Sequence, residues 1–168
     1  MSRKLSIVSG GFDPAHVGHL ELFEKAKSIA DDLFVILNCD KFLERKKGKP
    51  FMPFKERQRM IEALKPVDMV VGSIDADDTV CKTLEWIHGI YNRKYSEIMF
   101  CNGGDRTYVG NTPEHTACVS LGIETVYGMG DKIQSSSSLI KKSAVALFMP
   151  GLAISFKPPA SWVKLRLQ

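Results

Sequence analysis

Short apolar runs and amphipathic segments alternate along most of this 168-residue chain. Five apolar, β-prone runs predict strands, at residues 4–9, 33–37, 67–71, 97–101 and 123–127. The run at 33–37 is apolar at every position, which is typical of a strand buried on both faces of a parallel sheet.

Segments with helical periodicity separate these runs. In residues 18–30 the apolar positions fall on one face and the charged positions on the other, as in a helix that covers a sheet. Further helices are predicted at 54–64, at 79–91 with an N-cap at Asp78 or Thr79, from Thr112 onward, and at 136–147. Residues 40–53 are rich in charge, glycine and proline, and we expect a loop there.

This alternation predicts an α/β domain over residues 1–147, with an open parallel sheet and helices on both faces. Ligands of such sheets bind beyond the carboxyl ends of the strands. Residues 148–168 are expected to form a C-terminal extension, because prolines and a glycine interrupt any helical period. Trp162 and Leu165 are too apolar for a free tail, so we expect the extension to pack on the body or on a partner subunit, as in a homodimer.

Composition narrows the class of protein. The apolar content of 44% and charged content of 25% are those of an ordinary globular domain. The net charge of +4 is mild, so nucleic acid is not the expected partner. The four cysteines lie far apart, which indicates reduced thiols. The sequence has no apolar run long enough to predict a membrane-spanning segment. We therefore expect a cytoplasmic protein.

The strongest chemical signal follows the first predicted strand, where residues 10–20 read GGFDPAHVGHL. A helix N-terminus presents free N–H groups and a positive dipole end, which suits anions, and glycines let the backbone approach a phosphate closely. His16 and His19 lie three residues apart and so share one helical face. The segment predicts a phosphate-binding turn with two imidazoles aimed at the ligand. No nearby cysteine or third histidine completes a zinc site.

These residues resemble the G-x-F-D-x-x-H-x-G-H signature of the cytidylyltransferase-like nucleotidyltransferases, the HxGH type. Residues 133–140, IQSSSSLI, are similar to that family's serine-threonine segment. The resemblance covers about residues 4–143 and includes glycerol-3-phosphate cytidylyltransferases and heptose-phosphate nucleotidyltransferases. It implies a Rossmann-like fold and the transfer of a nucleoside monophosphate to a phosphorylated polyol, sugar or amino alcohol.

By this resemblance, a phosphate oxygen of the acceptor attacks the α-phosphate of a nucleoside triphosphate in line, and pyrophosphate leaves. Mg²⁺ accompanies the triphosphate, with no side-chain metal ligand expected. The protein must align the reactants and neutralise developing charge. The resemblance assigns these catalytic roles to His16, His19 and Lys46.

The resemblance also implies nucleotide contacts by the backbone of Gly11 and Phe12. Asp13 either contacts the nucleotide or holds the turn. A second lysine of the family's loop corresponds to Lys47 or Lys49, while a solvated charge run is the other interpretation of this segment.

Two groups of residues complete the expected site. For the nucleotide they are Gly104, Asp105, Lys132, Ser135, Ser136 and Ser137, and for the acceptor Arg57, Lys82 and Arg106. Asp105 is either a ligand of a base amino group or substrate hydroxyl, or a plain turn residue. Arg57 is either a phosphate ligand or an ion-pair anchor.

One position departs from the cytidylyltransferase pattern. Those enzymes often carry an arginine before the serine-threonine segment, and Lys132 stands near that place here, without the bidentate fork of a guanidinium. We expect CTP as the donor, with ATP as the alternative for an adenylyltransferase of the heptose-phosphate or pantetheine-phosphate type. A non-catalytic nucleotide-binding regulator is the rival from another class.

Overall fold

The computed structural model describes residues 3–103, 112–130 and 134–147. Its contacts divide the chain into one compact unit that ends at Ser136 and a second that begins at Ser137. The extension expected at 148–168 lies outside the described residues.

The first unit is built on a five-stranded sheet. Its strands are β1 (Arg3–Gly10), β2 (Asp32–Leu37), β3 (Met69–Gly72), β4 (Tyr95–Gly103) and β5 (Glu124–Met129). They run parallel in the order β3-β2-β1-β4-β5, and Ile7 of the central strand pairs with Phe34 on one side and Phe100 on the other. All five predicted strands are confirmed, with ends that shift by at most two residues.

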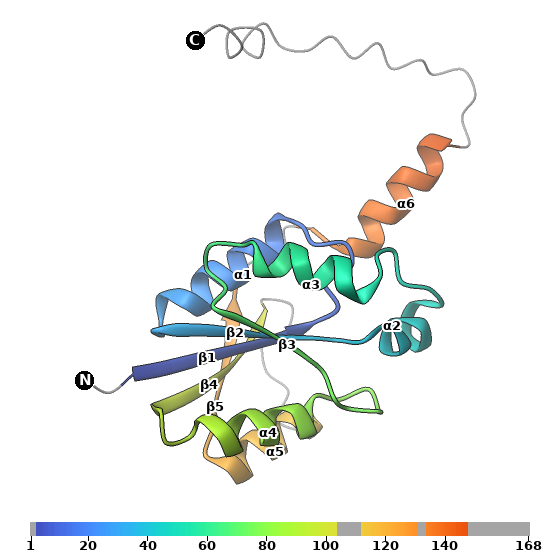
Figure 1. Cartoon of the computed structure of the whole chain (residues 1–168). Coiled ribbons are helices and arrows are strands. Elements are labelled where there is room, and N and C mark those ends of the chain that lie inside the picture. The colour runs from blue at the N-terminus through green and yellow to red at the C-terminus, as the bar shows by residue number, and fades with distance from the viewer. Residues whose placement is uncertain (1–2, 104–111, 131–133, 148–168) are drawn as a thin grey trace, which may run out of the picture. The chain divides into compact units, whose positions relative to one another are not determined.

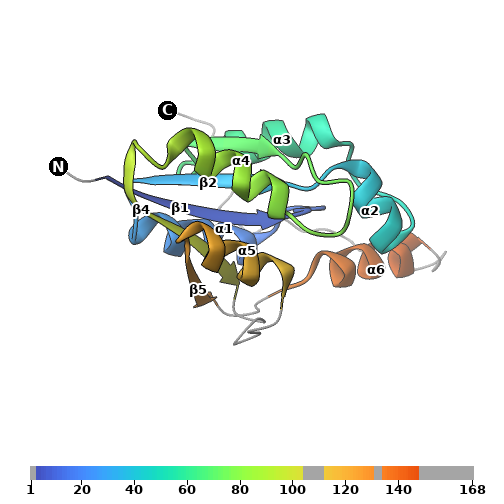
Figure 2. The same ribbon diagram turned by 90° about the horizontal axis from the view of Figure 1, so that it is seen from below.

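The helices of the first unit cover both faces of this sheet. Helices α1 (Val17–Ser28) and α3 (Phe54–Glu62) lie on one face, and α4 (Cys81–Tyr91) and α5 (Pro113–Leu121) lie on the other (Figures 1 and 2). Helix α6 (Ser136–Leu147) begins at the last residue of the unit. The fold is the Rossmann-like α/β sheet that the sequence predicts. No helix of the described residues is long and apolar enough to cross a membrane.

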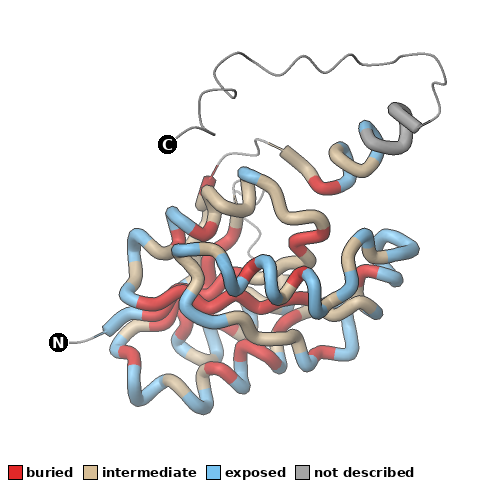
Figure 3. Tube along the Cα trace, turned by 45° about the horizontal axis from the view of Figure 1, so that its top comes forward, coloured by how far each residue is buried: buried red, intermediate tan, exposed pale blue. Residues whose placement is uncertain are grey.

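The alternation of side chains along each strand produces two cores, one on each face of the sheet. Figure 3 shows that buried residues gather along the strands. Phe34 and Ile36 point toward Leu84 and Ile87 of α4. Leu33, Val35 and Leu37 join the opposite core, which includes Phe23 of α1 and Ile61 of α3. Every residue of β2 is buried, as its continuous apolar run predicts.

The predicted loop at 40–53 is wrong in its first half, because residues Asp40–Lys47 form helix α2. Asp40 lies in the first turn, basic residues fill the last turn, and both placements favour a helix by its dipole. Gly48 ends the helix with a positive φ of 85°, a conformation that glycine adopts without steric cost. Leu43 anchors the helix to the body with 1% of its surface exposed.

The predicted cap of α4 is also corrected. The helix begins at Cys81 rather than at Thr79, and the carboxylate of Asp75 accepts hydrogen bonds from the backbone N–H groups of Lys82, at 2.8 Å, and Thr83, at 3.1 Å. A carboxylate from the preceding loop thus satisfies N–H groups that have no partner inside the helix. The stretch between 72 and 80 has no periodicity that would place this residue from sequence.

Candidate active site

A cavity of about 180 Å³ lies at the carboxyl edge of the sheet, within the first unit. The segment that follows β1 forms one wall, with Gly10, Gly11, Phe12 and His19. The end of β2 and helix α2 form another wall, and further lining comes from Ser9, Asp78, Val80, Glu114 and Ser136. We call this space the carboxyl-edge cavity. It lies where the parallel sheet predicts a ligand.

The glycine turn is shaped by close packing. A Cβ added to Gly10 would lie 2.8 Å from the Phe12 ring, and one added to Gly11 would lie 2.6 Å from Cδ2 of Leu43. Phe12 itself has a positive φ of 47°, which is uncommon for a side chain of this size. Its ring makes edge contacts with Phe23 and His19, and these contacts hold the strained backbone in place.

His19 is fixed in one orientation and one tautomer. Its Nδ1 accepts a hydrogen bond from the backbone N–H of His16 at 3.3 Å, so in the neutral ring Nε2 carries the proton and is a donor. Burial, followed by the charges of His16 and Lys47, lowers the pKa of His19 to about 3. The ring is therefore neutral at physiological pH in the unliganded protein.

His16 stacks on His19, with ring centroids 3.7 Å apart and planes at 21°. Among the described residues, no hydrogen-bond partner reaches the buried Nδ1 of His16. Burial and the charge of Lys47 lower the pKa of His16 as well. The two imidazoles thus share the start of α1, as the i and i+3 spacing predicts.

Helix α2 brings two of the three candidate lysines to the cavity. Lys46 and Lys47 line it, and Lys49, beyond the helix, does not. The Lys46 ammonium lies over the Phe42 ring at 5.5 Å from the centroid. Lys47 donates a hydrogen bond to the carbonyl oxygen of Asp13 at 3.2 Å. Partial burial lowers the pKa of Lys47, helped by the charges of Lys46 and Arg57 and opposed by that of Asp13. Of the two lysines left open by the sequence, Lys47 is the one at the cavity.

Asp13 holds the turn rather than lining the cavity. Its side chain is 1% exposed, and its two carboxylate oxygens accept hydrogen bonds from the backbone N–H groups of Phe51 and Met52, each at 2.7 Å. Of the two roles open to Asp13, these contacts match the structural one, because both oxygens already have donors.

Arg57 is a buried anchor and not a wall of the cavity. Its guanidinium has no exposed surface and donates to the carbonyl oxygens of Gly11, Asn38 and Met52 and to the Asp40 carboxylate. These partners belong to the glycine turn, the end of β2, the loop before α3 and the start of α2. Of its two expected roles, these contacts match the ion-pair anchor, because the guanidinium already has four acceptors within the protein.

The remaining candidates divide into three groups. Ser136 lines the cavity and donates a hydrogen bond to the carbonyl oxygen of Pro14 at 2.9 Å, while Ser135 precedes helix α6 and Ser137 is exposed in its first turn. Lys82 is exposed on α4 and does not line the cavity. Gly104, Asp105, Arg106 and Lys132 lie outside the described residues.

Sequence reasoning missed Asn38, which follows β2 and lines the cavity with 6% of its surface exposed. The signal was a polar residue that immediately follows an apolar strand, at the edge where a parallel sheet binds ligands. Within the described part of the chain, no group of three histidine, cysteine or acidic side chains is arranged to hold a metal ion.

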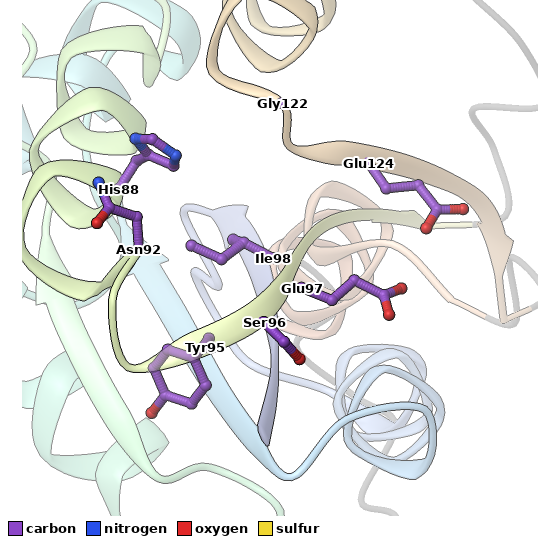
Figure 4. A pocket seen from close by; sticks show the side chains of 8 residues that line it. All are labelled: His88, Asn92, Tyr95, Ser96, Glu97, Ile98, Gly122 and Glu124. Carbon is purple, nitrogen blue, oxygen red and sulfur yellow. The ribbon is translucent and has the colours of Figure 1, made fainter. Parts of the chain in front are cut away.

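A second cavity lies at the other end of the sheet, around the first residues of β4 (Figure 4). His88 and Asn92 line it from α4, Tyr95 and Glu97 from β4, and Glu124 from β5. Glu97 already has a cation, because Lys4 pairs with its carboxylate at 2.6 Å. This cavity lacks the lysines, the glycine turn and the helix N-terminus that favour phosphate binding.

Comparison with known proteins gives one family and several relatives. The model of the cytidylyltransferase-like family matches residues 7–142. An FAD synthase of Thermococcus sibiricus is 44% identical over 71 residues, which are 41% of this chain and 48% of that protein. An FAD synthase of Ferroglobus placidus is 38% identical over 84 residues, which are 50% of this chain and 53% of that protein. The chain therefore spans about half the length of these curated relatives.

A solved structure shows the same fold. A lipopolysaccharide core biosynthesis protein of Thermoplasma volcanium superposes with a TM-score of 0.59 at 22% identity, over 79% of this chain and all of that one. At this level of identity the likeness concerns the fold alone.

Proposed function

Since the chain belongs to the cytidylyltransferase-like family, we propose that it transfers a nucleoside monophosphate from a Mg²⁺-bound triphosphate to a phosphorylated small molecule. The observation that carries this proposal is a cavity that His19 lines together with Lys46 and Lys47 of α2, with His16 stacked on His19. Three kinds of phosphate-binding group meet there: imidazole N–H, ammonium and the N-terminal end of a helix.

The proposed reaction requires that the protein align the donor and acceptor phosphates and neutralise the negative charge on them. The Nε2–H of His19 donates to a non-bridging oxygen of the α-phosphate, and Lys46 and Lys47 neutralise charge on the phosphate chain. Because both imidazoles are neutral in the unliganded protein, the incoming phosphates raise their pKa values and favour proton uptake. His16 stacks on His19 and limits its rotation, so the donor is in place before the reaction.

ATP is the donor that we propose. The curated relatives are named as synthases of FAD, a dinucleotide that contains adenine, and Lys132 replaces the arginine of the cytidylyltransferase pattern. The motif resemblance at residues 10–20 and at Lys46 supports CTP as the second candidate. The acceptor class is a phosphorylated molecule that also carries hydroxyl groups.

Pyrophosphate release in a matrix of donors and acceptors tests this function. ATP, CTP, GTP and UTP are each combined with glycerol 3-phosphate, ribose 5-phosphate or FMN, with Mg²⁺ and without it. We expect release only where donor, acceptor and Mg²⁺ are all present, and with ATP before CTP. Hydrolysis of the triphosphate without an acceptor contradicts the proposal, and nucleotide binding without turnover in every combination favours the regulatory alternative.

A further inference from the structure

The side chain of Asn38 has a polar atom that the folded protein leaves without a partner. Its Oδ1 is buried, and no donor among the described residues reaches it. The backbone around it is fixed on both sides: the N–H of Asn38 donates to Gly10 O at 3.0 Å, and its carbonyl oxygen accepts from Arg57 at 2.9 Å. The residue is therefore held rigidly while its amide oxygen remains free.

Such an arrangement is unfavourable for stability alone. A buried polar atom without a hydrogen bond retains the cost of losing water, and most buried polar atoms in folded proteins are paired. An apolar side chain of similar shape would avoid that cost. Asn38 lines the carboxyl-edge cavity, so a ligand that brings a hydrogen-bond donor supplies the missing partner.

The side chains around Asn38 indicate which chemical group of a ligand would donate to its amide oxygen. Lys46 and Lys47 supply positive charge for phosphates, whereas the Asn38 amide oxygen and the carboxylates of Asp78 and Glu114 in the same cavity accept hydrogen bonds. Hydroxyl groups donate to such acceptors, and phosphate oxygens do not. Asn38 and the two lysines line the same cavity, so one molecule can bring a phosphate to the lysines and a hydroxyl to Asn38.

We propose that Asn38 is a specificity-determining residue that accepts a hydrogen bond from a hydroxyl of the phosphorylated acceptor. This inference rests on the proposed nucleotidyl transfer, whose acceptor it describes as a polyol or sugar phosphate. The ribose hydroxyls of the donor nucleotide offer the same chemistry, and the experiment below separates the two sources.

The test compares wild type with Asn38→Leu, which removes the polar atoms and keeps a similar volume. Calorimetry measures the Kd of ribose 5-phosphate and 2-deoxyribose 5-phosphate, of glycerol 3-phosphate and propyl phosphate, and of ATP and 2′-deoxy-ATP. Thermal unfolding gives the Tm of each variant. Tyr95→Phe is the matched control, because Tyr95 is a buried polar residue whose hydroxyl is paired with Asp32 at the far end of the sheet.

We expect Asn38→Leu to weaken the binding of a hydroxylated phosphate about 10- to 100-fold and that of its deoxy counterpart less than 2-fold. Its Tm should equal or exceed that of wild type, whereas Tyr95→Phe should lower the Tm and change no Kd. Equal affinity of wild type for hydroxylated and deoxy probes overturns the proposal, as does a lower Tm of Asn38→Leu with unchanged binding. A loss confined to ATP, absent with 2′-deoxy-ATP, overturns the acceptor assignment.

Failure of the proposed function leaves a different result. In that case wild type releases no pyrophosphate in the donor–acceptor matrix, whatever the binding data for Asn38→Leu show.

Discussion

The two edges of the sheet treat their polar groups in opposite ways. At the amino edge, Asp32 accepts hydrogen bonds from Arg3 at 2.7 Å and from the hydroxyl of Tyr95, and Lys4 pairs with Glu97. At the carboxyl edge, the buried Nδ1 of His16 and Oδ1 of Asn38 have no partner among the described residues.

Electrostatics follows the same division. Hydrogen bonds and the charge of Arg3 hold the pKa of Asp32 below its usual value although burial opposes this, so the group is stabilised in its charged form. Burial and nearby positive charge instead lower the pKa values of His16, His19 and Lys47. The polar groups named at the amino edge are thus paired within the protein, while the carboxyl edge combines buried unpaired atoms with the lysines of α2, a combination that favours a functional site.

Arg57 differs from the other polar groups named at the carboxyl edge, because its guanidinium is paired within the protein. Arg57→Met should lower the free energy of unfolding by about 3–5 kcal/mol, since it removes the cation paired with Asp40 and the Arg57 donors to three carbonyl oxygens. Urea unfolding measures the loss. If Arg57→Met unfolds like wild type but no longer binds ATP, Arg57 is a phosphate ligand and not an anchor.

Substitution of the histidines should lower activity and leave stability nearly unchanged, the reverse of the effect expected for Arg57→Met. His16→Ala and His19→Ala should each lower kcat on the order of 10²-fold, the scale for loss of one donor to a developing negative charge, with little change in Tm. Steady-state pyrophosphate release measures kcat, and Tyr95→Phe at the amino edge is the control that should keep it. Near-normal turnover of either histidine variant contradicts the proposed site.

The three lysines of residues 46–49 should differ in their effect on activity, because Lys46 and Lys47 line the cavity and Lys49 does not. Lys46→Ala and Lys47→Ala should each lose about 2 kcal/mol of transition-state stabilisation, roughly 30-fold in kcat/KM, and Lys49→Ala should lose less than 2-fold. Measurement at low and moderate salt separates these roles from a solvated charge run. Three equal losses that fade with salt would assign the segment to the surface.

The last prediction concerns the pH dependence of stability. The pKa of His19 lies near 3 in the folded chain and near 6.5 when unfolded, so between these values the unfolded state binds more protons. This contribution to stability is present above pH 6.5 and is lost as the pH falls toward 3, by at most about 1.4 kcal/mol per pH unit. His19→Gln should flatten the slope in urea unfolding between pH 6.5 and 5, and an unchanged slope would show that His19 is not buried neutral.

The sequence predicted the sheet well because β2 and its neighbours carry unambiguous apolar runs, and it placed His16 and His19 because their spacing is local. It missed helix α2, since Gly48 and the charged residues suggested a loop, and tertiary anchoring by Leu43 was not visible. The roles of Asp13 and Arg57 depend on partners 38 to 46 residues away, namely Phe51 and Gly11, and such contacts leave no local pattern. The place of Asn38 directly after β2 can be read from the sequence, but its unpaired amide oxygen is a property of the folded chain.

Hydrogen–deuterium exchange, with and without Mg²⁺–ATP, tests most directly whether the carboxyl edge is the binding edge. We predict slower exchange in peptides that cover residues 9–20 and 38–48, where the glycine turn, His19 and α2 line the cavity. Peptides that cover residues 88–98, at the cavity of the amino edge, should exchange at the same rate in both conditions. Protection confined to residues 88–98, or unchanged exchange at both edges under saturating ATP, would contradict it.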